Sequence, residues 1–520
     1  MVRFRPARIA LVIAFALLSR VAVADQTGSK PIRPGVPGKT PFWNEKARQF
    51  MFPPAFDFKP VAEAMTYRFT LVCSDGKLRS FDAAEPWATL TPVWGEVPVG
   101  PIELRVEGLD SSGGQVVGLA GTRSFHRAAE FNGPYGKPVL PYDESARVAL
   151  RSVILEPFVQ SWRTTGKPDP KYALYRYASK INGSLISGCA RYASQTPRPD
   201  DADDAIDIGR RAADYLLSIS SPAGAPLEHF PPTYHGAKPT ERENDNWTML
   251  MTAAEAGQGY LDLYDVTRDD KYLQGALRIA ETYGKTQRED GTWPLKVDNT
   301  TGKPIAEIDL IPSVVVNFLD RFDEQYHIDA HRKTRDRAIA WIMANPAATF
   351  DWKAQFDDAK VRGAYQNLSK HEACEFAGYL FRHAKDDPEK LALAQDIVRW
   401  AEDQFVVWEK PPDFQPRSPA LAAENWFVPC SLEQYAMFEP ISGSSAFMIV
   451  AHVRAHRATG DAMYLRKAES LANALTVAQQ HHNGRYPTRM IKQDLAYWIN
   501  STINTARAML MLAEEQKRVD

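Results

Sequence analysis

The spacing of apolar and polar residues changes once along the chain. From about residue 50 to 130, apolar and polar side chains alternate in short runs, of which 67–73, 102–106 and 123–125 are the clearest. Turn sequences such as Ser74-Asp75-Gly76 separate these runs. A period of two predicts strands that bury one face. We therefore expect a small antiparallel β-sandwich over residues 50–135.

From about residue 145 to the end, apolar residues recur every three to four positions, which is typical of amphipathic helices. This spacing predicts twelve helices, near residues 146–162, 171–193, 203–220, 246–264, 270–286, 308–326, 331–345, 370–384, 387–405, 442–457, 462–480 and 495–515. Twelve helices make six hairpins. The chain is therefore predicted to be mainly α-helical, with one helical domain over residues 145–520.

An internal repeat supports the hairpins. The stretch from Thr267 to Gly291-Thr292-Trp293-Pro294 recurs from Thr459 to Gly484-Arg485-Tyr486-Pro487. Each copy has a short turn that contains aspartate, an amphipathic helix and a Gly-x-aromatic-Pro exit. Stacked hairpins leave such repeats because each unit buries its apolar face on its neighbours. The first interpretation of the repeat is therefore architectural.

The connections between the predicted helices differ on alternate sides. One set is short and polar, as at 265–270 and 458–462. The other set is long and rich in aromatic, histidine and acidic residues, at 222–245, 287–307, 346–369, 406–441 and 481–494. Long irregular loops are uncommon in a compact domain unless they are functional. Since all of them precede the same alternate set of helices, we expect them to form one rim, which is the active face.

The N-terminus predicts export. Three arginines precede an apolar run over residues 9–18, and Ala22-Val23-Ala24 precedes Asp25, as in a signal peptide cleaved near Ala24/Asp25. A membrane anchor is the alternative, but the run is only about half of the ~20 residues that span a bilayer. Residues 25–49 are rich in proline and glycine and predict a linker. We expect a secreted or periplasmic protein with no membrane span after signal removal.

The composition restricts the classes of molecule that the protein is expected to bind. A formal net charge of −2 argues against nucleic acid. Aromatic residues make up 11% of the chain, with 12 Trp and 20 Tyr, and flat rings can stack on the apolar faces of sugars. The four cysteines include no CxxC pair, which excludes a disulfide scaffold and a zinc-ligand set. A disulfide between Cys374 and Cys430 and buried free thiols both remain open.

Two chemistries fit such a rim. Glycoside hydrolysis needs two carboxyl groups that flank the scissile bond. The candidates are Glu243, Asp245, Asp309, Glu372, Glu433 and Glu439. Abstraction of the C5 proton of a uronic acid needs a tyrosine or histidine base and polar groups that neutralise the carboxylate. The candidates are Tyr234, His235, His371, Tyr435, Tyr486, Arg489 and Asn500.

Structural roles compete with some of these. Glu243 and Asp245 stand at a predicted helix start, where acidic residues are often caps. His371 and Glu375 lie one turn apart, but the zincin pattern His-Glu-x-x-His is absent, so we predict no metal site and no cofactor. The remaining rim residues are candidates for substrate binding: Trp247, Trp293, Asp309, Tyr365, Trp426, Trp498 and Asn500. For Trp293, a structural helix-capping role is the alternative.

The arrangement resembles known enzyme architectures. The strand region resembles a fibronectin type III or immunoglobulin-like module. A sandwich followed by six hairpins resembles the (α/α)6-toroid carbohydrate-active enzymes, which include polysaccharide lyases, hydrolases and glucuronyl C5-epimerases. The segments that resemble the epimerases are Ala256-Gly257-Gln258-Gly259, Tyr272-Leu273, Pro312 to Asn317, Gly484-Arg485-Tyr486 and Thr502-Ile503-Asn504. This resemblance implies a catalytic role for Tyr486 alone, since Ala306 to Asp309 replaces the epimerases' Glu-Glu-Tyr stretch.

These observations predict an exported two-domain enzyme with a polysaccharide or oligosaccharide substrate. We expect a polymer that contains uronic acid and C5 proton abstraction of the lyase or epimerase type. Hydrolysis by a carboxylate pair on the same rim remains an alternative, as does a non-catalytic glycan-binding protein.

Overall fold

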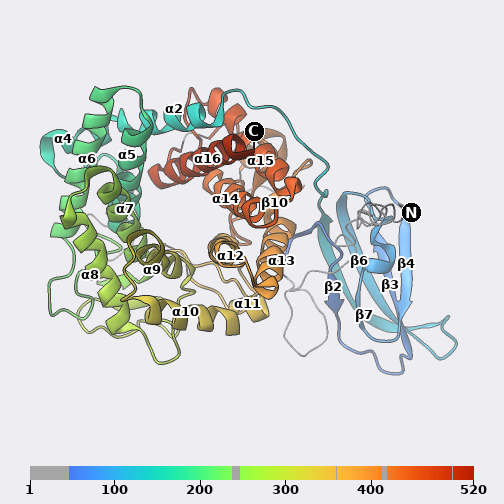
Figure 1. The fold of residues 1–520 in the computed structure, drawn as a ribbon. Coiled ribbons are helices and arrows are strands. Elements are labelled where there is room, and N and C mark those ends of the chain that lie inside the picture. Colours follow the sequence, from blue (N-terminus) through green and yellow to red (C-terminus); the bar gives the residue numbers. More distant parts are fainter. Residues whose placement is uncertain (1–45, 237–245, 359, 413–417, 495, 520) are drawn as a thin grey trace, which may run out of the picture.

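The computed structural model describes residues 46–236, 246–358, 360–412, 418–494 and 496–519. A ring of paired helices forms the larger part, and a β-sheet lies beside it (Figure 1). The predicted signal peptide, most of the predicted linker, and Glu243 and Asp245 lie outside the described residues. Among the described helices, none combines the length and the apolar composition that a membrane crossing needs.

Twelve helices of twelve residues or more are described, and they form two concentric rings. The inner ring contains α5 (Gly183–Gln195), α7 (Met251–Thr267), α9 (Ser313–Tyr326), α12 (His371–Arg382), α14 (Ser442–Thr459) and α16 (Ile499–Val519). The outer ring contains α2 (Tyr142–Ile154), α6 (Pro199–Ser218), α8 (Asp270–Thr286), α10 (Arg332–Ala344), α13 (Pro388–Phe405) and α15 (Ala462–His481).

The inner ring is closed. Each inner helix contacts the next in chain order, and α16 contacts α5, which completes the circle. Each inner helix also packs on an outer helix that is its neighbour in the chain, except that α16 packs on α2. The first and last long helices thus form the sixth hairpin, and the predicted toroid of six hairpins is confirmed (Figure 1).

Short elements fill the connections of the toroid. The helical ones are α3 (Pro157–Gln160), α4 (Trp162–Thr165), η2 (Ala173–Arg176), η3 (Ala178–Asn182), α11 (Pro346–Thr349), η4 (Pro419–Leu421) and η5 (Ala423–Asn425). The strands are β8 (Trp247–Met249), β9 (Lys296–Asp298), β10 (Val406–Val407) and β11 (Cys430–Ser431), paired as β8–β9 and β10–β11.

The sequence repeat has a structural cause. The Asp269 and Asp461 side chains cap α8 and α15 by accepting backbone N–H groups. Where these helices end, Gln287 Nε2 donates to the Gly291 carbonyl at 2.8 Å, and Gln479 Nε2 donates to the Gly484 carbonyl at 3.0 Å. Each glutamine thus fixes the exit turn after its helix, and the aromatic residue of that turn is buried. The architectural interpretation is confirmed.

The strands that precede the toroid form one five-stranded sheet and one two-stranded sheet. The large sheet has the order β1-β7-β6-β3-β4, from β1 (Gln49–Phe50), β3 (Thr66–Val72), β4 (Leu78–Ala83), β6 (Gly100–Leu109) and β7 (Val116–Arg127). All its pairs are antiparallel except β1 with β7. Alternate residues of β3 and β6 are buried, as the period of two predicts. Beside it, β2 (Ala55–Asp57) pairs only with β5 (Trp87–Thr89), and α1 (Thr91–Trp94) follows; a fibronectin-like sandwich is not confirmed.

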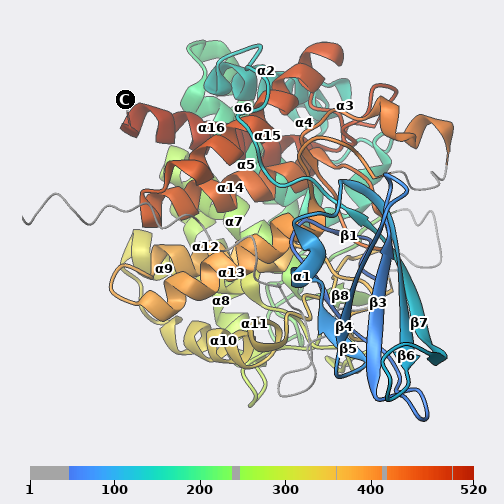
Figure 2. The same cartoon turned by 90° about the vertical axis from the view of Figure 1, so that its right-hand side faces the viewer.

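Buried hydrogen bonds join the sheet to the toroid. Asp403 on α13 accepts the backbone N–H groups of Met51 and Phe52 at 2.6 and 2.8 Å. Gln49 on β1 donates to the Val406 carbonyl at 3.0 Å. Figure 2 shows the sheet against this flank of the ring, with α13 beside β1. The sheet therefore supports the outer ring. All four cysteines are buried and free, including Cys374 and Cys430.

Candidate active site

The long connections all lie at the N-terminal ends of the inner helices. They span residues 155–182, 219–250, 287–312, 345–370, 406–441 and 482–498, and each leads into an inner helix. Figure 2 views the ring edge-on, with the C-terminal end of α16 on the opposite face. A cavity of about 360 Å³, which we call the front cavity, opens among these connections. Helix N-termini carry partial positive charge and stabilise anionic groups placed near them.

A carboxylate pair with an ammonium group lies in the front cavity. Glu255 on α7 and Asp357 on the 345–370 connection both line it, together with Lys180 on η3. Lys180 Nζ donates to Asp357 Oδ1 at 3.4 Å, and Asp357 Oδ2 is buried without a hydrogen-bond partner. Glu255 Oε2 is also buried and has no hydrogen-bond partner. Each carboxyl group therefore has one buried oxygen without a hydrogen-bond partner.

The two carboxyl groups have different environments. Burial raises the pKa of Glu255 to about 7, with Lys180 acting against burial and Asp357 reinforcing it. The pKa of Lys180 is raised because attraction to Asp357 and Glu255 outweighs its burial. Lys180 therefore stays charged and forms an ion pair with Asp357.

The backbone that carries Asp357 is held at three points. Gln355 Oε1 accepts the Ile311 N–H at 3.0 Å, and Gln355 Nε2 donates to the Asp309 carbonyl at 2.7 Å. Lys296 Nζ donates to the Asp357 carbonyl at 2.9 Å. Two neighbouring connections thus fix the position of this carboxylate, which is the preorganisation that a catalytic group needs.

His371 begins α12 and faces the front cavity. Its ring lies 4.3 Å from that of Phe447 on α14. Burial lowers the pKa of His371 to about 4, so the imidazole is neutral at physiological pH. The next residue, Glu372, is directed into the protein, where burial raises its pKa well above the usual range. Glu372 is therefore a neutral buried acid that does not line the cavity.

Lys370 joins the start of α12 to the 406–441 connection. Lys370 Nζ donates to the backbone carbonyls of Leu432 and Glu433. Burial lowers the pKa of Lys370 to about 7, opposed by Glu433. Burial also raises the pKa of Glu433, whose carboxylate accepts Gln434 Nε2 at 3.1 Å. Lys370 thus fixes the 406–441 connection at the start of α12.

Five of the predicted site residues line the front cavity: His371, Glu433, Arg489, Trp498 and Asn500. Arg489 Nε donates to Glu439 at 2.8 Å, and its guanidinium lies 3.4 Å from Asp494. Glu439 is buried and reaches the cavity only through Arg489. Arg489 is therefore already neutralised by two carboxylates.

The three predicted tyrosines are buried away from the front cavity. Tyr486 is fully buried, and its hydroxyl lies 2.6 Å from Ser145 on α2. Tyr435 donates to Gln404 on α13 at 2.9 Å. The Tyr234 ring packs against Trp247 at 5.2 Å. Burial raises the pKa of Tyr486, so its hydroxyl stays protonated.

The other predicted residues also lie outside the lining of the front cavity. The His235 ring lies 6.2 Å from Tyr215 on α6. Trp293 is fully buried and donates to the Tyr283 carbonyl. The remaining three make local contacts: Asp309 pairs with Arg288, the Tyr365 hydroxyl donates to the Thr349 carbonyl, and Trp426 Nε1 donates to the Leu421 carbonyl. These residues are placed to support the loops.

Sequence reasoning missed Glu255, Asp357, Lys180 and Lys370. Asp357-Asp358 stands in a connection that was already predicted to be functional, so its two acids were a usable signal. Glu255 stands inside a helical pattern, where an acid can face water, a partner or the ring axis. Only closure of the ring shows that it faces the axis.

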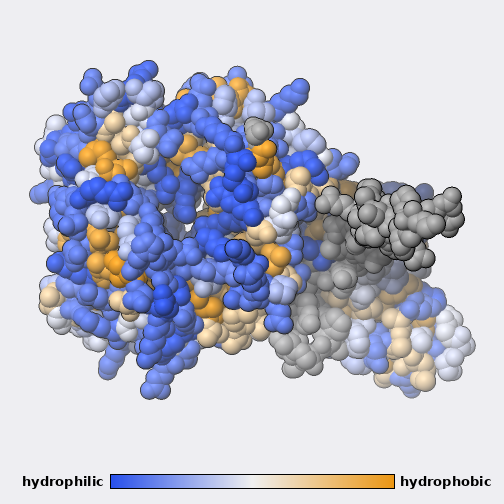
Figure 3. All heavy atoms as spheres, in the orientation of Figure 1, coloured by the Kyte–Doolittle hydropathy of each residue, from blue (hydrophilic) through white to orange (hydrophobic). Residues whose placement is uncertain are grey.

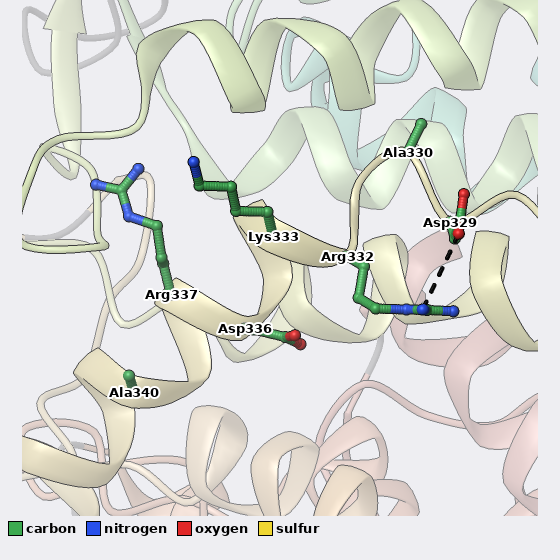
Figure 4. Close-up of a pocket in the computed structure, with 7 residues that line it drawn as sticks. All are labelled: Asp329, Ala330, Arg332, Lys333, Asp336, Arg337 and Ala340. Atoms are coloured by element: carbon green, nitrogen blue, oxygen red, sulfur yellow. Dashed lines mark ion pairs between the residues drawn. The ribbon is translucent and has the colours of Figure 1, made fainter.

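Two other places in the structure were candidates for a functional site. Within the described residues, one group, Asp320, Glu324 and His383, could surround a metal ion. However, Asp320 already accepts Arg335 and Arg382 at 2.9 and 3.0 Å, so positive charge occupies it. A shallow hollow on α10 is lined by mostly exposed charged residues, and Figure 4 shows its side chains pointing in different directions, with Arg332 paired to Asp329.

Comparisons with known proteins identify a fold. No protein-family model matches the chain, and no curated protein matches its sequence. Among solved structures, a family 76 glycoside hydrolase from a bovine Bacteroides thetaiotaomicron strain superposes with a TM-score of 0.51 at 11% identity, covering 90% of this chain and 98% of that one. A cellobiose 2-epimerase from Spirochaeta thermophila DSM 6192 superposes with a TM-score of 0.50 at 12% identity, covering 73% and 98%. The chain is therefore similar in fold to the (α/α)-toroid carbohydrate-active enzymes.

Proposed function

We propose that this protein is a glycoside hydrolase, with Glu255 as the general acid and Asp357 as the ionised partner. The observation that carries the proposal is the unpartnered Glu255 carboxyl group, protonated near neutral pH, on the same cavity as the Lys180–Asp357 pair. Hydrolysis of a glycosidic bond needs one carboxylic acid to protonate the leaving oxygen and one carboxylate as base or nucleophile. Glu255 would supply the acid, and Asp357, paired with Lys180, would supply the carboxylate.

The cavity also favours a sugar as substrate. Its volume of about 360 Å³ falls in the range of ligand pockets, about 300–1,000 Å³. Trp498 offers a flat ring for stacking, and Asn500 and Gln434 offer hydrogen bonds to hydroxyl groups. The similarity in fold to a glycoside hydrolase and a sugar epimerase supports a glycan substrate.

The charges favour a neutral sugar at the point of cleavage over a uronic acid. Among the described residues of the front cavity, Lys180 and Arg489 already have carboxylate partners, and Lys370 donates to two carbonyls. A uronate carboxylate would therefore have to compete for an occupied cation.

C5 proton abstraction is the second candidate, and His371 supports it. A neutral imidazole in the cavity can accept a proton from carbon. In this scheme His371 replaces the predicted tyrosine bases, and Lys370, which lines the same cavity, would stabilise the developing enolate. The same residues would serve a lyase or an epimerase.

The test separates the two reactions. The purified protein is incubated with neutral and uronic-acid polysaccharides, while new reducing ends and the ultraviolet absorbance of unsaturated uronate are followed. We expect new reducing ends without unsaturation. Glu255→Gln and Asp357→Asn should each reduce kcat/KM by about 10²–10⁴-fold, and Glu228→Gln, at a surface pair with Lys285, should not.

Other outcomes identify the alternatives. Unsaturated product, or C5 exchange with deuterated solvent, that is lost in His371→Asn but kept in Glu255→Gln would replace hydrolysis by proton abstraction. Retained glycan binding without any product would indicate a binding protein. Export of the chain to the periplasm or the medium remains a prediction.

A further inference from the structure

A second cavity opens at the other end of the ring, where the inner helices finish. Its volume is about 560 Å³, and all six inner helices contribute to its lining. We call it the back cavity. Figure 3 views the molecule from the side on which α16 ends and shows a hollow at the centre of the ring, surrounded by hydrophilic residues. Glu255 and His371 line both cavities, but the arginines of the back cavity take no part in the catalytic roles proposed above.

Six arginines line the back cavity, and four of them have carboxylate partners. Arg191 and Arg321 share Asp262, at 2.9 and 2.7 Å. Arg382 pairs with Asp320 at 3.0 Å, and Arg457 pairs with Glu515 at 2.6 Å. Arginine is favoured where helices end, because the partial charge of a helix C-terminus is negative. The charges of these four arginines are therefore balanced by carboxylates of the toroid.

Arg454 on α14 and Arg507 on α16 have no ion pair within 4.0 Å among the described residues. Arg454 Nη1 is buried and has no hydrogen-bond partner. Burial and then repulsion from Arg382 lower the pKa of Arg454 to about 9. Burial and then Arg191 lower the pKa of Arg507. Both groups stay charged at neutral pH, so the cavity holds positive charge that lacks a partner.

The helix opposite makes room for Arg454. A Cβ added to Gly378 on α12 would lie 1.9 Å from Arg454 Nη1, so the guanidinium lies against the bare backbone at that position. The Arg454 side chain also lines the back cavity.

The acids of the back cavity do not neutralise these two arginines. Glu375 faces both, and attraction to them lowers its pKa despite burial, so it contributes one negative charge against two positive charges. Its carboxylate accepts Asn317 Nδ2 at 2.7 Å. Asp262 and Asp320 pair with arginines as given above, and Asp265 pairs with Arg321. Glu324 lies 3.9 Å from Arg382. The remaining lining acids are the exposed Glu514 and Glu255.

We propose that the back cavity binds a small oxyanion between Arg454 and Arg507. The chemical class is a carboxylate, sulfate or phosphate group, because the guanidinium fork matches two oxygens of such a group. A bound anion would supply a counter-charge to Arg454 and Arg507, and buried charge without an ion pair is costly. The proposal rests on Arg454 and Arg507, which have no role in the proposed hydrolysis, although Glu255 lines both cavities.

The test uses inorganic sulfate, inorganic phosphate and glucuronate as probes, in a chloride background of constant ionic strength. Titration calorimetry on the full chain should show saturable binding of one anion per chain. Arg454→Gln and Arg507→Gln should each weaken binding at least about tenfold. Arg211→Gln, at an exposed pair with Asp207 on α6, should leave it unchanged.

A second measurement guards against a folding defect. Without added oxyanion, Arg454→Gln should melt at the same temperature as the wild type or higher, because it removes a buried charge without a partner. With saturating sulfate the wild type should gain melting temperature and the variant should not. Saturable binding of the inorganic ions but not glucuronate assigns the site to sulfate or phosphate; the reverse assigns it to a carboxylate. The proposal is overturned if no probe shows saturable binding. It is also overturned if Arg454→Gln and Arg507→Gln both bind with the affinity of the wild type.

Discussion

The contact between Lys180 and Asp357 allows the acid–base assignment to be tested with one substitution. Lys180 Nζ lies 3.4 Å from Asp357 Oδ1, and the Asp357 side chain is 3% exposed. Two unit charges at this distance attract by about 5 kcal/mol at an effective dielectric constant of about 20. Desolvation offsets part of this, and removing one partner of a buried pair costs about 3–5 kcal/mol. Since Lys180 is 29% exposed, we expect Lys180→Gln to lower the free energy of unfolding by about 3 kcal/mol.

The same substitution should shift the pH dependence of activity. Glu255 acts as an acid only while protonated, so activity should fall as the pH rises through its pKa of about 7. Lys180 lowers that pKa, so its removal should move the fall in activity to higher pH. Activity at the optimum should also fall, because Asp357 loses its nearest positive charge. Urea unfolding measures the first effect, and kcat/KM between pH 4 and 9 measures the second.

A surface lysine provides the matched control. Lys285 Nζ lies 2.6 Å from Glu228, but its side chain is 61% exposed, and exposed pairs contribute less than about 1 kcal/mol. Lys285→Gln should therefore change neither stability nor the pH profile appreciably. If Lys180→Gln folds and its alkaline limb coincides with that of the wild type, Glu255 is not the acid.

Three further predictions follow from particular contacts. Tyr486→Phe should leave kcat/KM unchanged and lower the free energy of unfolding by about 1 kcal/mol, because its hydroxyl contacts Ser145 in the outer ring; a large loss of kcat/KM measured with intact folding would instead restore the role implied by the epimerase resemblance. Gly378→Ala should displace the Arg454 guanidinium and weaken oxyanion binding in calorimetry with little change in melting temperature, so binding at wild-type strength would contradict the placement of Arg454. Interactions with Arg518, Arg457 and His456 hold the pKa of Glu515 at about 2, so its contribution to stability is present above its ordinary pKa and is lost as the pH falls towards 2. Glu515→Gln should therefore reduce the loss of stability at acid pH in urea unfolding. An unchanged pH dependence would contradict this assignment.

Much of the fold was readable from periodicity. The helix predicted at 270–286 is α8, with the same bounds. Other boundaries moved for local reasons. The helix predicted at 146–162 ends at Ile154, and Pro157 begins the separate short helix α3. The helix predicted from residue 171 begins at Gly183, after η2 and η3. Irregular turns before an inner helix carry Lys180 into the cavity, and no pattern of three to four residues predicts them.

The candidate site was predicted less well than its location. Of the eighteen candidate site residues, the structure brings His371, Glu433, Arg489, Trp498 and Asn500 together on the front cavity. The buried tyrosines show why residue type was a poor guide. Tyr486 stands at the same position of the sequence repeat as Trp293, and both are fully buried behind their helices. An aromatic residue in a long connection packs against the helix ends as readily as it faces substrate.

The sequence by itself determined the helices, their pairing and the face that carries the long connections, because burial on a helix repeats at a fixed interval and connection length is a property of the chain. Only the tertiary structure decided which polar residues meet. Lys180, Glu255 and Asp357 come from three different connections and helices, and their interaction exists because the inner ring closes. An inner helix is covered by protein on most sides, so a polar residue that faces the central axis has the same local pattern as one that pairs within the wall. Closure of the ring distinguishes the two, and it depends on contacts between residues far apart in the chain.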